Sequence, residues 1–205
     1  MTHPIYLFRH GETAWNAEKR AQGALDSPLT SAGEAQARAM GAAFAAELRR
    51  AGTPAADVVV RASPLGRVRQ TLRLAAAAAG LAHDEACFDP RLREMSWGEW
   101  DGLVGAEIEA RWPGALAARR LAHWTYAPPG GESYVMAVDR ARPALDDLRA
   151  LAAGAPVAVF AHGAIGRILR GLWLDAPRER VLTMDQPQDA FYVLTPGGCE
   201  RVPAA

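Results

Sequence analysis

The amino-acid sequence predicts an α/β fold, namely a three-layer α/β/α domain with a mostly parallel central sheet and an inserted lid region. Short runs of apolar, often β-branched residues at 5–8, 58–60 and 156–161 have the composition of strands covered on both faces. Each run is followed by a segment with the apolar spacing of a helix, an alternation typical of parallel sheets. The 205 residues are 50% hydrophobic and 22% charged, enough to bury a core without disulfides or metals.

The first strand, Ile5 to Phe8, ends at the polar sequence Arg-His-Gly, and residues 9–30 are expected to form a loop. Thr30 or Ser31 can then cap a helix, because both are favoured N-cap residues. Apolar residues that recur every four positions support this helix, and basic residues with a glycine suit its end. These residues are Met40, Phe44 and Leu48, and Arg49, Arg50 and Gly52.

The remaining elements follow from similar patterns. Pro64 is expected to start the helix after the strand at 58–60, because proline is favoured in the first helical turn. A second strand–helix unit is expected late in the chain, and Ala190 to Leu194 supplies a final strand. The late unit comprises a helix over 133–153 apart from Pro143, a strand over 156–161 and a helix over 165–173.

The stretch 88–131 interrupts this order with several tryptophans and a Pro-Pro-Gly-Gly sequence. No internal repeat or linker divides the chain, so we expect one domain over residues 1–205. Within it, residues 95–131 are predicted to be a lid and substrate-specificity insertion over the site. Its larger side chains either line the lid or pack within it, and they are Trp97, Arg111, Trp112, Arg119, Arg120, His123, Trp124 and Tyr126.

Composition excludes several classes of function. The 23 basic and 23 acidic residues cancel, so no overall charge attracts nucleic acid or an anionic membrane. Cys87 and Cys199 are too few for a disulfide framework or a four-ligand metal site. The sequence shows neither a signal peptide nor the ~20 apolar residues that span a bilayer. We therefore expect a cytoplasmic protein with no nucleic-acid or membrane partner, and we predict no particular oligomeric state.

A histidine followed by glycine stands at the end of two predicted strands. His10 follows the strand at 5–8, and His162 follows the strand at 156–161. If these parallel strands are neighbours, their carboxyl ends bring the two imidazoles together where α/β sheets bind ligands. The glycines, Gly11 and Gly163, would let the backbone approach the ligand closely, and we count Gly163 among the substrate-binding residues.

Two arginines within reach of these strand ends indicate that the ligand carries a phosphate group. Arg9 and Arg67 can each form forked hydrogen bonds to a tetrahedral oxyanion. Together with histidine and backbone N–H groups they would neutralise the phosphoryl charge without a metal. A neutral His10 could attack phosphorus, and Glu94 is the candidate acid that protonates the departing alkoxide. This chemistry needs no cofactor.

These residues belong to longer patterns that resemble the signature of the histidine phosphatases, the phosphoglycerate mutase-like superfamily. The resemblance spans most of the chain. The matching residues are Leu7-Phe8-Arg9-His10-Gly11-Glu12-Thr13, Trp15-Asn16, Gln22-Gly23, Asp26, Pro28-Leu29-Thr30, Gly33, Gln36-Ala37, Ser63-Pro64-Leu65 with Arg67, Gln70 and Thr71, then Glu94 with Gly98, Trp100 and Gly102, and His162-Gly163.

The resemblance implies a role for each residue of the predicted site. It implies that His10 is the phosphorylated nucleophile, and that Arg9, Arg67 and His162 form the phosphate pocket. Glu94 would donate the proton to the leaving group and later act as base for water. The resemblance also places three residues near the bound phosphate, namely Asn16, Gln22 and Gly23.

Mutases and phosphatases of this superfamily share these residues. The stretch between Glu94 and His162 is shorter than the insertion of family mutases, and Pro128 to Ser133 resembles the phosphatase branch that includes α-ribazole phosphatases and broad-specificity phosphatases. We therefore expect a metal-independent histidine acid-type phosphatase acting on a small phosphate ester. Phosphoglycerate mutase-type phosphoryl transfer is the alternative within the family. A non-catalytic module that binds a phosphorylated ligand is the alternative from another class.

Two further hypotheses rest on isolated residues. Cys87 and Arg93 have the Cys-x5-Arg spacing of cysteine phosphatases, but Pro90 between them has no N–H with which to cradle an anion. Ser63 and His162 could belong to a serine hydrolase, but no Gly-x-Ser-x-Gly elbow surrounds the serine. The remaining histidines are expected at surface or structurally satisfied positions, and they are His3, His83 and His123.

Overall fold

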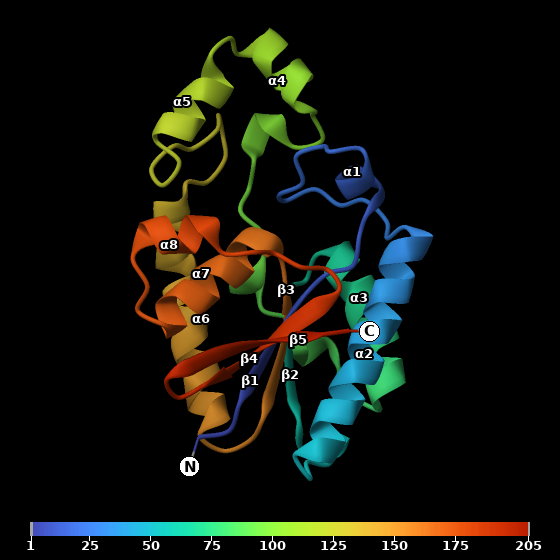
Figure 1. Cartoon of the computed structure of the whole chain (residues 1–205). Coiled ribbons are helices and arrows are strands. Elements are labelled where there is room, and N and C mark those ends of the chain that lie inside the picture. The colour runs from blue at the N-terminus through green and yellow to red at the C-terminus, as the bar shows by residue number, and fades with distance from the viewer. Residues whose placement is uncertain (1, 205) are drawn as a thin grey trace.

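The structure is a computed structural model that describes residues 2–204, with the side chain of residue 86 left out. Within this part of the chain, five strands form a sheet in the order β2-β3-β1-β4-β5 (Figure 1). β3 runs parallel to β1 and β2, whereas β4 is antiparallel to β1 and β5. The predicted α/β class is therefore confirmed, with parallel strands in the centre and an antiparallel edge. The strands are β1 (Ile5–Arg9), β2 (Val59–Ala62), β3 (Val157–Ala161), β4 (Ala190–Thr195) and β5 (Gly198–Pro203).

Helices cover both faces of the sheet. α2 and α3 lie on one face, and α6 and α7 lie on the other (Figure 1). Side chains of β1 alternate between the two layers, because Tyr6 and Phe8 pack toward α2 and α3 while Ile5 and Leu7 pack toward α6 and α7. Burial on both faces explains the continuous apolar runs in the sequence. The four helices are α2 (Ser31–Arg50), α3 (Gly66–Ala79), α6 (Tyr134–Ala152) and α7 (Gly163–Trp173).

The α2 helix begins and packs as its sequence predicts. The Thr30 hydroxyl accepts a hydrogen bond from the Gly33 N–H at 3.0 Å, which caps the helix. The apolar residues at four-residue spacing are buried, and the Phe44 ring lies 5.2 Å from the ring of Phe8. Phe8 in turn stacks on Phe160 of β3 at 4.5 Å. Aromatic contacts thus join this helix to the centre of the sheet.

Short helices lie beyond the carboxyl ends of the parallel strands. Figure 1 shows α4 and α5 at the end of the molecule far from the N-terminus, and both belong to the predicted insertion. None of the helices among the described residues combines the length and apolar character needed to cross a bilayer. The short helices are α1 (Ala14–Ala17), α4 (Gly105–Arg111), α5 (Ala115–Leu121) and α8 (Arg178–Thr183), with 3-10 turns at Ala55–Asp57, Glu85–Cys87, Pro90–Leu92 and Gly98–Trp100.

Two helices differ from their predicted bounds for identifiable reasons. α3 begins at Gly66 instead of Pro64, because the Asp26 carboxylate accepts hydrogen bonds from the N–H groups of Gly66 and Arg67 and so caps the helix there. α6 continues through Pro143 without interruption. Pro143 lies on the exposed face, where water can satisfy the carbonyl that proline leaves without a donor. α7 begins at Gly163, two residues before its predicted start.

The edge strand β5 was not predicted from the sequence. β5 pairs with β4 through Gly198 to Pro203, and Thr195 and Gly198 are register partners across the turn. Most side chains of β5 are exposed or half-buried, so the strand lacks the apolar pattern that marks the buried strands. The available signal was the Pro196-Gly197-Gly198 sequence, which is typical of a hairpin turn.

Candidate active site

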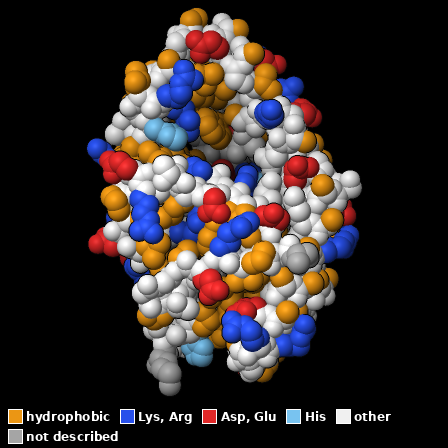
Figure 2. All heavy atoms as spheres, viewed as in Figure 1, with side chains coloured by type: hydrophobic (Ala, Val, Ile, Leu, Met, Phe, Trp, Pro, Cys, Tyr) orange, Lys and Arg blue, Asp and Glu red, His pale blue; other side chains and the backbone are white. Residues whose placement is uncertain are grey.

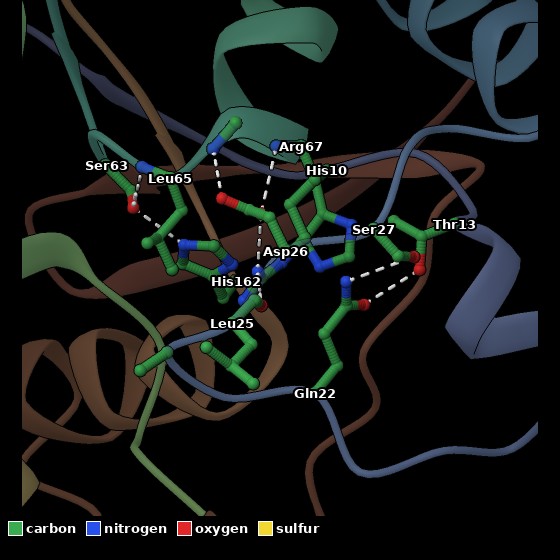
Figure 3. A network of polar contacts seen from close by, with 12 residues as sticks. His10, Thr13, Gln22, Leu25, Asp26, Ser27, Ser63, Leu65, Arg67 and His162 are labelled. Atoms are coloured by element: carbon green, nitrogen blue, oxygen red, sulfur yellow. Dashed lines mark hydrogen bonds and ion pairs between the residues drawn. The ribbon is translucent and has the colours of Figure 1, made fainter. Parts of the chain in front are cut away.

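The carboxyl ends of β1 and β3 bring the two His-Gly sequences together. Arg9 and Ala161 are register partners in these adjacent strands, and His10 and His162 are the residues that follow them. The two imidazole rings have centroids 5.3 Å apart and planes inclined by 62° (Figure 3). Both side chains are buried, with 4% and 1% of their surface exposed. The predicted meeting of the two histidines is therefore confirmed.

The His10 ring has one bonded and one free nitrogen. Nδ1 lies 2.8 Å from the carbonyl oxygen of Gly11, and because a carbonyl only accepts, Nδ1 carries the ring proton. Burial and the positive charges of Arg67 and Arg9 hold the pKa of His10 well below its ordinary value. The ring is therefore neutral at pH 7, and Nε2 holds an unshared electron pair suited to nucleophilic attack.

The His162 ring is oriented by Ser63, the residue that directly follows β2. Nε2 of His162 lies 2.7 Å from the Ser63 hydroxyl oxygen, which also accepts the Leu65 N–H at 3.4 Å. Ser63 can donate its hydroxyl proton to Nε2, and in that tautomer the ring proton lies on Nδ1. That Nδ1 is buried without a partner among the described residues. Figure 3 shows the ring between Ser63 and Arg67. Its free N–H can donate to a bound anion.

Arg67 of α3 is completely buried and is held from one side. Nη1 donates to the Leu25 carbonyl at 2.9 Å and to the Asp26 carboxylate at 2.8 Å, and Nη2 donates to the Gly23 carbonyl at 2.8 Å (Figure 3). Two of the five N–H groups of the guanidinium remain, and the buried one on Nε has no partner. The guanidinium is thereby fixed with donors left over for a ligand.

Arg9, at the end of β1, completes what we call the anion pocket, formed by Arg9, His10, Arg67 and His162. Its Nη1 donates to the Gln186 carbonyl, while its Nε is buried and unpartnered within residues 2–204. Among the described residues, the anion pocket thus contains three buried side-chain nitrogens without partners, namely the Nε–H donors of Arg9 and Arg67 and Nδ1 of His162. Leaving such a donor unsatisfied costs about 1–3 kcal/mol, so a bound oxyanion would stabilise all three at once.

Glu94 is held by the first turn of α7. One carboxylate oxygen accepts the Ala164 N–H at 3.1 Å, and the other accepts the N–H groups of Ile165 at 3.2 Å and Met95 at 3.0 Å. Helix N-termini favour carboxylates, because their N–H groups have no partner within the helix. Since α7 begins directly after His162, one helix fixes the acid relative to the second histidine.

Arg140 of α6 fastens the segment on both sides of Glu94. Its Nη1 donates to the Arg93 carbonyl at 2.9 Å, and its Nε and Nη2 donate to the two carboxylate oxygens of Glu132 at 3.0 and 2.9 Å. The same Glu132 carboxylate accepts the Ser96 N–H at 2.9 Å. The residues before and after Glu94 are thus joined through one ion pair whose side chains are about four-fifths buried.

Asn16 and Gln22, both predicted near the phosphate, line a cavity that Arg9 of the anion pocket and Glu94 also line. Asn16 donates to the Gln22 side-chain oxygen at 3.4 Å and accepts from Gln188 at 2.9 Å. Gln22 also accepts from the Thr13 hydroxyl at 2.8 Å (Figure 3). These bonds hold the two amides at the cavity edge.

The two predicted substrate-binding glycines have close neighbours. The Gly23 carbonyl accepts from Arg67, and a Cβ at position 23 would lie 2.5 Å from the Met95 carbonyl oxygen. At Gly163 a Cβ would lie 2.5 Å from the side-chain oxygen of Gln186. The backbone leaves no room for a side chain at position 23, whereas at position 163 the obstacle is the end of the flexible Gln186 side chain, which can move.

The cavity has a volume of about 350 Å³ and opens between the insertion and the sheet. Figure 2 shows the hollow, with basic and apolar side chains around it. Of the larger lid side chains named from the sequence, four line it: Trp97, Arg119, His123 and Tyr126. His123 is half-exposed in the cavity wall, so of the two roles considered for it, lining the lid or packing, it lines the lid.

The other lid candidates lie away from this lining. Trp112 packs against Trp100 at 6.3 Å, and Trp124 stacks on Tyr134 at 5.4 Å. Arg111 and Arg120 are exposed. The alternative that part of the insertion merely packs therefore holds for Trp112 and Trp124.

Comparison with known families matches residues 5–203 to the histidine phosphatase superfamily (branch 1). The chain belongs to this superfamily. A histidine phosphatase relative, glucosyl-3-phosphoglycerate phosphatase of Mycolicibacterium vanbaalenii, is 34% identical over 185 residues, which cover 84% of this chain and 75% of the relative. The probable phosphoglycerate mutase GpmB of Escherichia coli is 39% identical over 166 residues, which cover 78% of this chain and 69% of the relative.

Solved structures agree with this assignment to the histidine phosphatases. A mycobacterial glucosyl-3-phosphoglycerate phosphatase in complex with VO3 superposes with a TM-score of 0.74 at 32% identity, over 94% of this chain and 92% of that chain. A putative α-ribazole-5'-P phosphatase from Escherichia coli superposes with a TM-score of 0.80 at 21% identity, over 99% and 96% of the two chains. The second likeness concerns the fold alone.

The structure does not support the two other nucleophiles considered from the sequence, Cys87 and Ser63. Cys87 lies outside the cavity lining, and burial raises the pKa of its thiol, which opposes a reactive thiolate. Ser63 has no exposed surface and is engaged by His162. The sequence analysis did not predict that Ser63 orients His162, although Ser63 directly follows a strand just as His10 and His162 do.

Proposed function

We propose that this histidine phosphatase hydrolyses monophosphate esters of small metabolites through a phosphohistidine on His10. The observation that carries the proposal is the free Nε2 of a neutral, buried His10 beside three buried side-chain nitrogens that have no partner among the described residues. Membership of the superfamily supports the phosphatase activity. The cavity of about 350 Å³ suits a small leaving group better than a macromolecule.

In the first half-reaction, Nε2 of His10 attacks phosphorus, a P–N bond forms and the P–O bond to the leaving group breaks. Arg9, Arg67 and the Nδ1–H of His162 would bind the equatorial oxygens, whose charge must be stabilised in the transition state. The protonated carboxyl of Glu94 gives its proton to the departing alkoxide oxygen.

In the second half-reaction, water replaces the alcohol. The Glu94 carboxylate takes a proton from the water, whose oxygen attacks phosphorus. The P–N bond then breaks, inorganic phosphate leaves and His10 returns to its neutral state. The positive charge needed throughout comes from arginine and imidazole N–H groups, so we propose that turnover requires no metal.

We also propose that residues 95–131 act as the specificity insertion of a single domain. The cavity side that faces away from the anion pocket is formed in part by this segment, including Trp97, Arg119 and Tyr126. Its side chains would then contact the alcohol portion of the ester, while the anion pocket holds the phosphate.

Trapping the intermediate tests the nucleophile. Native protein, His10→Ala and the exposed-histidine control His83→Ala are mixed with a 32P-labelled ester and quenched in alkaline denaturant. We expect native protein and His83→Ala to carry label that survives base and is released by mild acid. We expect His10→Ala to carry none and to lose at least about 1000-fold in turnover.

Three outcomes would contradict the proposal. An unlabelled native chain that binds the ester without turnover would favour the non-catalytic module. Dominant transfer of phosphate to another hydroxyl would favour the mutase alternative. Activity that is lost with EDTA and restored by Mg²⁺ would overturn metal independence.

A further inference from the structure

Three basic side chains stand together on the cavity wall beyond the anion pocket. Arg119 comes from α5, His123 from the turn after it, and Arg167 from α7. We call these three residues the cationic wall. They belong to two separate parts of the sequence, 119–123 and 167, so the fold is what brings them to one cavity.

The cationic wall has no acidic partner within residues 2–204. Arg119 makes no hydrogen bond or ion pair there, and the Nε of Arg167 donates to the backbone carbonyl of Met184. Arg20, which also lines the cavity, differs because it pairs with Glu18 at 2.7 Å and Glu107 at 3.2 Å. The charge of Arg20 is thus neutralised by the protein, whereas that of the cationic wall is not.

The acidic side chains of the cavity are engaged elsewhere. Glu94 is held by backbone N–H groups of α7, and Glu132 is paired with Arg140. Neither carboxylate forms an ion pair with Arg119 or Arg167 among the described residues. An anionic group on the ligand would therefore meet unneutralised positive charge.

Aromatic rings orient the cationic wall. The Arg119 guanidinium lies 4.5 Å from the ring centroid of Trp97, whose ring also stacks with Trp100 at 6.2 Å. His123 contacts the ring of Tyr134 edge to face at 5.4 Å. The Trp97 ring is occupied in holding Arg119, because a cation over an indole face is stabilised by the ring quadrupole. The Tyr134 ring contacts His123, whose lowered pKa leaves the imidazole neutral at pH 7. Both rings are therefore poor candidates for stacking against an aromatic leaving group.

The members of the cationic wall are close enough to interact electrostatically. Burial and the charges of Arg119 and Arg167 lower the pKa of His123. Burial also lowers the pKa of Arg9, to which the charge of Arg167 contributes. The charges of Arg119 and Arg167 thus lie near His123, and the charge of Arg167 also acts on Arg9 of the anion pocket.

We propose that the cationic wall binds a second anionic oxygen group, carried by the leaving group of the phosphate ester. The inference rests on the proposed function and specifies its substrate class, namely esters with a carboxylate or a second phosphate. Arg119 is the specificity-determining residue, since its guanidinium has all its donors free and can form a forked pair with two oxygens. Esters of neutral or purely aromatic alcohols would lack this contact.

Binding to a catalytically disabled chain tests the inference without requiring turnover. On a His10→Ala background, calorimetry compares 3-phosphoglycerate with glycerol 3-phosphate, which has a hydroxymethyl group in place of the carboxylate. Propane-1,3-diyl bisphosphate supplies a second phosphate, and phenyl phosphate supplies an aromatic leaving group. We expect 3-phosphoglycerate, which carries both a phosphate and a carboxylate, to bind at least about tenfold more tightly than glycerol 3-phosphate, which carries the phosphate alone.

Two arginine variants on the same helix isolate the residue responsible. Arg119→Gln is expected to reduce the preference for 3-phosphoglycerate to about threefold or less, whereas Arg120→Gln, its exposed neighbour, is expected to keep it. Arg167→Gln provides a second variant that should reduce the preference, and circular dichroism checks that each variant is folded. Preference for the bisphosphate over the carboxylate would identify phosphate as the second group.

Equal affinity for the charged and uncharged esters would overturn the inference. So would an Arg119→Gln variant that weakens both esters by the same factor, or tightest binding of phenyl phosphate. These results differ from failure of the proposed function, which would appear as absence of labelled His10 and of turnover in the native chain while the binding preference persisted.

Discussion

The anion pocket and the cationic wall meet at one cavity, which Arg9 lines from the first and Arg119 and Arg167 line from the second, but they are built in opposite ways. Side chains of the anion pocket follow strands β1 and β3 or stand on α3, and His10, Arg67 and His162 are buried. Members of the cationic wall are half-exposed, and two of them lie in or next to a seven-residue helix outside the sheet. The anion pocket is fixed by hydrogen bonds to backbone and polar side chains. In the cationic wall, Arg119 and His123 are held by aromatic contacts, and Arg167 donates to the Met184 carbonyl.

This difference matches the two proposed roles, phosphoryl transfer in the anion pocket and recognition of the leaving group by the cationic wall. Phosphoryl transfer requires donors held to within about 0.5 Å, which buried residues on rigid elements provide. Recognition of the leaving group tolerates looser placement, and the cationic wall can change with the insertion without moving the sheet. Related proteins could thus keep one reaction and accept different esters.

Among the tests of this comparison, the largest effect is expected from Arg67→Lys, which tests whether the anion pocket depends on fixed geometry or only on charge. Lysine keeps the charge but cannot bond Gly23, Leu25 and Asp26 while presenting two donors to phosphate. We expect kcat/KM to fall about 100-fold or more, as for loss of a transition-state donor. Steady-state kinetics measure it, with Arg69→Lys on the same helix as control. A change below threefold would show that charge alone suffices.

A smaller effect is expected from Arg140→Met, which tests whether Arg140 positions Glu94 beside the anion pocket. Methionine keeps the stem but releases the carbonyl of Arg93 and the carboxylate of Glu132. We expect turnover of an alkyl phosphate to fall about tenfold, because displacement of the acid by less than 1 Å is costly. Turnover of p-nitrophenyl phosphate should fall less, since its leaving group needs little protonation.

The leaving-group dependence distinguishes positioning from a general structural role for Arg140. Glu94→Gln should show the same dependence, and the double variant should lose little more than Glu94→Gln alone. Arg142→Met, at an exposed position of the same helix, is the matched control. Equal losses on both esters in Arg140→Met would exclude an effect through Glu94.

The smallest effect concerns stability and pH, and it tests the burial of the anion pocket. Because the pKa values of His10 and His162 lie well below the ordinary value in the folded protein, the unfolded chain binds more protons as pH falls. The free energy of unfolding should therefore decrease between pH 7.5 and 5.5, by at most about 1.4 kcal/mol per histidine.

Urea denaturation of native protein, His10→Gln and His162→Gln at the two pH values measures this contribution. Each variant should lose part of the pH dependence, whereas the exposed-site variant His83→Gln should keep it. A pH dependence unchanged in both buried-site variants would show that the two rings are accessible to solvent in the folded state.

The anion pocket could be predicted from the sequence because its residues sit at points that local patterns define. His10 and His162 directly follow apolar strands, and parallel pairing of β1 and β3 brings such positions together. Ser63 follows a strand in the same way, but its contact with His162 depends on β2 pairing with β3, which the sequence order did not specify.

The cationic wall could not be assembled from the sequence. Whether Arg119 or its neighbour Arg120 faces the cavity depends on the orientation of a short helix, and Trp97 is too distant in sequence to indicate its contact with Arg119. Apolar periodicity is also weak over seven residues. The same limitation explains why the sequence left open whether His123 lines the lid or packs.

Gly23 has a consequence for altering this protein by design. Its carbonyl supports Arg67, its N–H is bound by Asp101 at 2.6 Å, and the backbone at 95–97 passes too close for any Cβ. The start of the insertion, residues 95–97, therefore packs directly against the backbone of Gly23. Libraries that diversify the insertion in search of new substrates should keep glycine at position 23. Even alanine there would push the insertion away from the anion pocket.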